Sequence, residues 1–220
     1  MTSTRRGFLL VFGPGLAAAA GIRAAPKEEA EVGPAEDLMR EHGVLRRVMF
    51  LYDEAARRLD GSETPPLDAL DAGAGIVRRV IEDYHEKLEE NFVFPRLEKA
   101  KKLTSLTSTL RQQHGAGRDV TAEIRRLAQG KLADADRSKL AGLLRAFNRM
   151  YRPHAAREDT VLFPAFHDLV GDKAWHEMGE RFEDEERKKL GDQGFEGAVA
   201  QVAKLEEQFG MADLAQFTPR

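Results

Sequence analysis

Two eleven-residue stretches decide the fold: HEKLEENFVFP at residues 85–95 and HAAREDTVLFP at residues 154–164. Each has a histidine, a glutamate four residues later, an acid directly after that glutamate, and Phe-Pro at the same offset. Residues four apart on an α-helix lie on one face, about 6 Å apart along the axis. The spacing therefore predicts two helices that each present a His and a Glu on one face.

One further histidine precedes each stretch, on the apolar face of another expected helix. His42 and His114 are separated by 72 residues, and His85 and His154 by 69. We interpret the chain as a duplicated helical hairpin, in which each copy supplies one isolated His and one His-x-x-x-Glu pair.

Apolar residues recur at helical spacing beyond residue 34, and no alternating strand pattern appears. The expected helices run from about residue 34 to 60, 67 to 100, 103 to 130 and 134 to 166. Short connections between them predict an all-α fold, an antiparallel up-down-up-down four-helix bundle over residues 35–166. Residues 167–220 form an expected C-terminal helical extension, with helices ending at Gly191 and Gly210.

The N-terminal residues 1–24 resemble an export signal. Thr4-Arg5-Arg6-Gly7-Phe8-Leu9 is similar to the twin-arginine signal, and a short apolar stretch follows it. An ordinary secretion signal and an uncleaved anchor are the alternatives. We expect an exported, periplasmic protein, with residues 25–34 as a linker and no membrane span in the mature chain.

Composition excludes several other classes of protein. The net charge is −3, and −6 without residues 1–24, so no basic nucleic-acid surface is expected. Cysteine is absent, which excludes disulfides, thiolate ligands and iron–sulfur clusters.

Folding the duplication into a bundle brings four histidines and two glutamates together at its centre. That gives two His and one carboxylate per metal, a set that suits non-haem Fe(II), and carboxylates can bridge two metals. Bare carboxylates buried on an apolar face would cost several kcal/mol each, so a cation is needed. The sequence therefore predicts two Fe ions, with Mn or Zn as alternatives, bound by His42, His85, Glu89, His114, His154 and Glu158.

Several nearby residues have a less specific interpretation. His167 and His176 lie outside the repeat and are expected on the surface or in packing. Pro153 could kink or bulge its helix and so aim His154 inward. Tyr52, Tyr84 and Tyr151 are expected near the site, as packing residues or hydrogen-bond donors.

The sequence resembles the hemerythrin-like, or HHE cation-binding, domain family over residues 35–166. The matching residues are Glu41-His42, residues 85–95, Gln113-His114 and residues 154–164, and residues 194–219 resemble extensions of some bacterial members. The resemblance implies a diiron centre with the same six ligands. Oxygen-carrying members have a second His four residues after the third-helix His, where this chain has Arg118, which argues against reversible oxygen carriage. Glu41 or Glu86 could supply a further oxygen ligand.

Three functions follow as hypotheses. The first is a binding or sensing module for O2, NO, peroxide or iron. The second is an oxidase or ferroxidase that uses the same open coordination positions. The third is a structural role in which metal only stabilises the bundle. A small ligand is the expected partner.

Overall fold

The computed structural model describes residues 33–61 and 63–219. The expected export signal and most of the expected linker lie outside this part of the chain. Within it the fold is all-α, as predicted, and no strand is present. Pro34, the last residue assigned to the linker, is the first residue of α1. Proline fits this position, because the first helical N–H has no partner within the helix.

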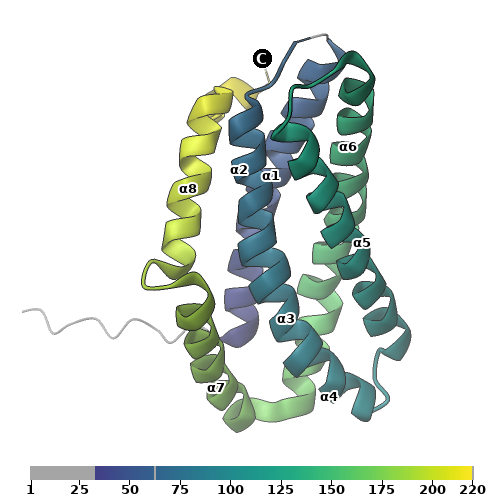
Figure 1. Ribbon diagram of the computed structural model, residues 1–220. Coiled ribbons are helices and arrows are strands. Elements are labelled where there is room, and N and C mark those ends of the chain that lie inside the picture. Colours follow the sequence, from purple (N-terminus) through teal and green to yellow (C-terminus); the bar gives the residue numbers. More distant parts are fainter. Residues whose placement is uncertain (1–32, 62, 220) are drawn as a thin grey trace, which may run out of the picture. The chain divides into compact units, whose positions relative to one another are not determined.

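Four helical segments form the bundle and alternate in direction (Figure 1). The first is α1 (Pro34–Asp60), and the third is α5 (Thr104–Ala128). The second spans residues 67–99 and consists of α2 (Leu67–Ile76), η1 (Val77–His85), α3 (Glu86–Leu88), η2 (Glu89–Val93) and α4 (Phe94–Lys99). The fourth consists of α6 (Asp134–Arg157), η3 (Glu158–Leu162) and the beginning of α7 (Phe163–Leu190).

The segments η2 and η3 are π-helical turns that occur at the same place in both copies of the repeat. Each begins at the repeat glutamate, Glu89 or Glu158, and ends two residues before Pro95 or Pro164. A proline inside an α-helix lacks an N–H and its ring collides with the carbonyl four residues earlier. A wider π turn removes this conflict. The repeated Phe-Pro therefore explains why both glutamates sit at the start of a widened turn.

The C-terminal extension packs onto the bundle and shares its core. The backbone of α7 leaves helical geometry at Gly171 (φ 72°, ψ 166°), where an L side chain would be strained. The helix α8 (Gly194–Phe209) packs against α1 and α2. Its buried face joins the core cluster of the bundle through Ala198, Val202, Leu205 and Phe209. A 3-10 turn, η4 (Leu214–Phe217), follows.

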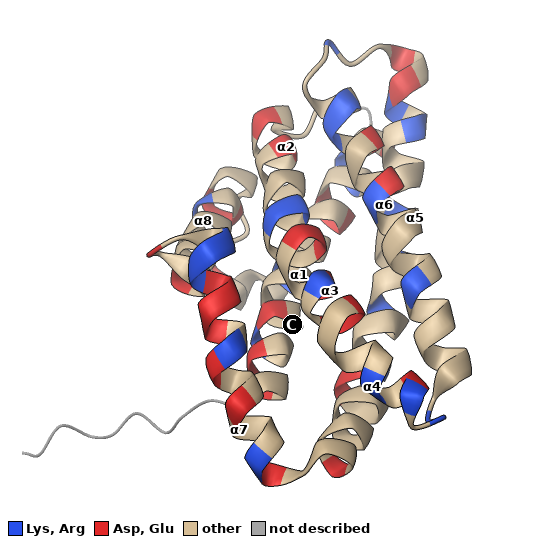
Figure 2. Ribbon diagram, turned by 60° about the horizontal axis from the view of Figure 1, so that its bottom comes forward, with Lys and Arg blue, Asp and Glu red and all other residues tan. Residues whose placement is uncertain are grey.

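The surface of α7 is densely charged over residues 181–189, and Figure 2 shows the charged residues along this helix. Met178 and Phe182 are the buried side chains that attach this part of α7 to the bundle. None of the helices in residues 33–61 and 63–219 combines the length and the apolar character that crossing a membrane requires.

Candidate metal centre

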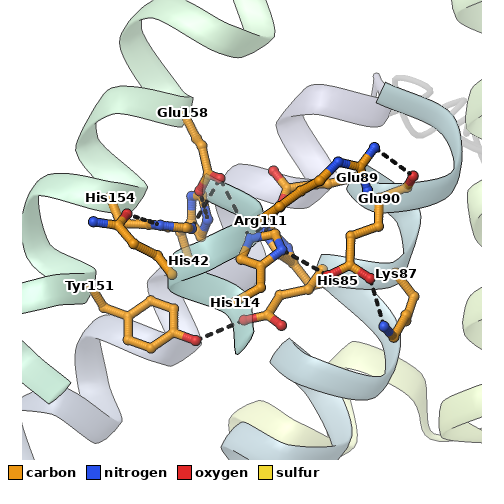
Figure 3. A network of polar contacts seen from close by, with 12 residues as sticks. His42, His85, Lys87, Glu89, Glu90, Arg111, His114, Tyr151, His154 and Glu158 are labelled. Atoms are coloured by element: carbon orange, nitrogen blue, oxygen red, sulfur yellow. Dashed lines mark hydrogen bonds and ion pairs between the residues drawn. The ribbon is translucent and has the colours of Figure 1, made fainter. Parts of the chain in front are cut away.

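The structure brings all six predicted ligand residues together inside the bundle (Figure 3). One comes from α1 (His42), two from the second bundle helix (His85 and Glu89), one from α5 (His114) and two from the fourth bundle helix (His154 and Glu158). Every one of them is at most 4% exposed.

Glu158 lies between two pairs of histidines. Its carboxylate oxygens are 3.3 Å from His42 Nε2, 3.0 Å from His154 Nε2 and 3.9 Å from His114 Nε2. Two sets of possible metal ligands share it: His42, His85 and Glu158, and His114, His154 and Glu158. Glu158 is therefore placed to bridge two cations.

Glu89 occupies the related position from the other hairpin. Its Oε2 is 3.4 Å from His114 Nε2 and 3.7 Å from His85 Nε2. The sequence repeat relates Glu89 to Glu158 and His114 to His42. The contact of Glu89 with His114 therefore corresponds to the contact of Glu158 with His42. Glu158 lies nearest the histidine of its own helix, His154, whereas Glu89 lies nearer His114 of α5 than His85 of its own helix.

Each histidine directs Nε2 inward and uses Nδ1 for a partner outside the ligand set. His42 Nδ1 is 2.6 Å from Asp159, and His114 Nδ1 is 3.1 Å from Glu90. His85 Nδ1 is 2.7 Å from Glu41, and His154 Nδ1 is 2.8 Å from the amide oxygen of Gln113. Such partners fix the ring orientation and the tautomer of metal-binding histidines.

These four residues were not predicted to be partners of the histidine Nδ1 atoms, although they occupy matching positions in the two copies of the repeat. Glu90 and Asp159 are the matched acids directly after the two repeat glutamates. Glu41 and Gln113 directly precede the two isolated histidines. Matched polar residues beside matched ligands would have pointed to them.

Glu41 and Glu86, considered as further ligands, are both buried and both have protein partners. Glu41 interacts with His85, whereas Glu86 accepts hydrogen bonds from Tyr151 Oη at 2.7 Å and from Arg118 at 2.6 Å. Arg118 also contacts Glu90 at 2.8 Å. The arginine thus binds two acids beside the centre.

The hydrogen bonding of the inward-facing atoms shows whether the site fits a metal. Buried side-chain atoms without a hydrogen-bond partner in the described residues include His85 Nε2, His114 Nε2, and both carboxylate oxygens of Glu89 and of Glu158. Buried polar atoms of native proteins are nearly always satisfied. Imidazole nitrogens and carboxylate oxygens that converge without partners form the donor set that a transition-metal ion requires. The residues therefore fit a metal pair.

The electrostatics of the centre agree with this fit. Burial and the charge of Glu158 raise the pKa of Glu89 well above its usual range. Burial would also raise the pKa of Glu158, but His154 and His42 hold it below its usual range. Burial and the neighbouring His42 lower the pKa of His85 well below its usual range. Neighbouring carboxylates disfavour each other's charge, and a cation between Glu89 and Glu158 would relieve this repulsion.

The other sequence predictions near the site concern Pro153, the tyrosines and the two histidines outside the repeat. Helix α6 runs through Pro153, and the π turn follows it at Glu158–Leu162, so no bulge aims His154 from that proline. Tyr151 donates a hydrogen bond next to the centre, and Tyr52 packs in the core. His167 is half-buried against Trp175, and His176 is exposed.

The comparison with known proteins agrees with the geometry. Uncharacterized proteins of Mycobacterium bovis and of two Mycobacterium tuberculosis strains are 48% identical to this chain over 198 residues, which cover 88% of this chain and 77% of theirs. No solved structure matches the chain significantly. A family described as Hemerythrin HHE cation binding domain matches residues 33–166 and again residues 106–207. These matches begin 73 residues apart, close to the spacing of the internal repeat. The chain belongs to the hemerythrin HHE cation-binding domain family.

Proposed function

We propose that this chain binds two non-haem iron ions between its two hairpins and uses them to bind or sense a small ligand: O2, NO, peroxide or iron itself. The observation that supports this most directly is the set of buried, inward-facing histidine and carboxylate atoms without hydrogen-bond partners. His42, His85, Glu89, His114, His154 and Glu158 would hold the metal.

Six side chains divided between two ions leave coordination positions for an added ligand, and iron supplies the affinity for O2, NO or peroxide. The surrounding side chains exclude water from these positions. The ring of Phe163 stacks on His42 with centroids 5.9 Å apart, and that of Phe94 stacks on His114 at 5.6 Å. The site is therefore suited to a small ligand.

Difference absorption spectra of the iron-loaded protein test the ligand class. We expect a saturable spectral change on adding O2 to the reduced protein, NO, or peroxide, and none in protein loaded with Zn, which has no redox chemistry. If fully iron-loaded protein responded to none of the three, binding or sensing of O2, NO and peroxide would be contradicted, and iron itself would be the ligand that remains.

We also propose that the protein is exported in folded form to the cell envelope. This proposal rests on Arg5, Arg6 and the apolar stretch after them. Fusing residues 1–34 to a reporter that folds in the cytoplasm tests it. Export should be lost in the Arg5→Lys, Arg6→Lys double variant. Undiminished export of that variant would contradict the twin-arginine route.

A further inference from the structure

The four histidines of the centre differ in what holds their outer nitrogen. His42 and His114 each contact a carboxylate, from Asp159 and Glu90 respectively. His154 contacts the neutral amide of Gln113. His85 contacts Glu41, which has no Lys or Arg within ion-pair distance among the described residues. The four imidazoles therefore have unequal partners, although their Nε2 atoms face the same centre.

Each of the carboxylates at His42 and His114 is also bound by an arginine. Arg46 forms an ion pair with Asp159. Arg118 forms an ion pair with Glu90 at 2.8 Å. Each arginine is four residues after the histidine that it supports, so both lie one helical turn away on the same helix. The acid comes from the other hairpin in both cases. We call these groups the α1 triad (His42, Asp159, Arg46) and the α5 triad (His114, Glu90, Arg118).

The triads are divided evenly between the two sets of metal ligands. His42 belongs to the set with His85 and Glu158, and His114 belongs to the set with His154 and Glu158. Each set therefore combines one histidine from a triad with one histidine outside the triads. A carboxylate acceptor on Nδ1–H raises the basicity of Nε2, and an arginine keeps that carboxylate ionised and in place.

We infer that the two triads make His42 and His114 the stronger nitrogen donors, one at each metal position, with Asp159, Glu90, Arg46 and Arg118 as positioning residues. This inference rests on the proposed metal pair and goes beyond it, because it assigns each positioning acid to one of the two ions. Each triad also joins the two hairpins, so metal affinity depends on their correct pairing.

Titration of the metal-free full-length chain with Co(II) against a competing chelator tests the inference, because it counts the bound ions and measures the affinity of each. Asp159→Asn and Glu90→Gln keep the size of the side chain and remove its charge. Each should weaken one of the two bound Co(II) ions about 10–100-fold, and the double variant should weaken both.

Gln113→Glu is the matched reverse change, because it places a carboxylate on His154, which has a neutral partner. It should tighten one ion and change the Co(II) absorption spectrum, an effect that a merely structural role would not produce. Circular dichroism of each metal-free variant confirms that it is folded.

The outcomes separate this inference from the proposed function. A wild-type chain that bound no Co(II) would overturn both. If the wild type bound two ions while the acid variants matched its affinities, or weakened both ions equally, only the assignment of the triads would be wrong.

Discussion

At the scale of single residues, the lack of a side chain at Gly117 makes room for Tyr151. A Cβ atom at Gly117 would be 2.0 Å from Tyr151 Oη, closer than atoms can approach. The tyrosine fills that space and donates to Glu86. Gly117 therefore allows Tyr151 and Glu86 to meet beside His154, whose ring centroid is 5.2 Å from that of the tyrosine.

Gly117→Ala should displace Tyr151, leave Glu86 with one partner fewer and destabilise the protein by about 1–3 kcal/mol, as overpacked cores do. Gly115→Ala is the matched control, since it lies on the same helix and its Cβ would meet nothing within 4 Å. Replacing this helical glycine should stabilise the protein by about 0.5–1 kcal/mol. Urea unfolding of both variants measures the difference. Equal stabilities would show that Tyr151 moves aside without penalty.

Sequence spacing predicts which side chains share one face of a helix. The His-x-x-x-Glu pairs and the two isolated histidines were identified this way, and the structure places all six at one centre. Their outer partners were missed because each of those contacts joins two different helices. His114 and Glu90, for example, meet only through the pairing of α5 with the second bundle helix. Helical periodicity gives a residue's face but not its neighbour on another helix.

At the scale of elements, the helix boundaries agreed with prediction within a few residues. Turn residues and prolines mark them, as at Gly61 and Pro66 before α2. The π turns were not predicted, because helical periodicity does not distinguish a π turn from an α turn. Pro153 directly precedes His154, but α6 continues through it, and the π turn lies just before Pro164.

The packing of α1 against α7 brings acidic residues close together. Burial, with the charges of Glu186 and Glu183, raises the pKa of Asp37 to about 6, although Arg40 opposes the shift. A carboxyl group whose pKa is higher in the folded state holds its proton more tightly there. Stability is therefore favoured below pH 4 and falls as the pH rises to about 6.

Asp37→Asn should remove this pH dependence. The variant should be more stable than the wild type by about 1 kcal/mol above pH 6, a value reduced for solvent screening and for the lost Arg40 pair. Below pH 4 the two proteins should be nearly equal. Unfolding curves from pH 4 to pH 8 test this expectation, and a difference that did not grow with pH would contradict it.

At the scale of the whole molecule, the C-terminal extension is part of the core. Sequence patterns indicated its helices and their glycine ends, but an amphipathic helix does not reveal what it covers. Phe209 of α8 is 2% exposed and belongs to the main core cluster, whereas Phe217 is 44% exposed. The extension therefore buries apolar surface on the bundle.

Phe209→Ala should destabilise the protein by about 3–5 kcal/mol because it leaves a cavity. Phe217→Ala changes the same residue type in the extension where it is partly exposed, so its effect should be much smaller. Both variants should keep the wild-type metal content while folded, since neither residue touches the centre. Thermal unfolding and metal analysis of the same samples check both statements. A Phe209→Ala variant as stable as Phe217→Ala would show that α8 contributes little.

Metal content per chain tests the central claim most directly. Protein matured in its own host and analysed by mass spectrometry for metals should contain about two irons per chain. Glu89→Ala and His154→Ala should lower iron content and melting temperature together, because metal binding stabilises the folded state. His167→Ala, outside the centre, should change neither. A well-folded wild-type chain without bound metal, or Glu89→Ala and His154→Ala variants with full iron, would contradict the account.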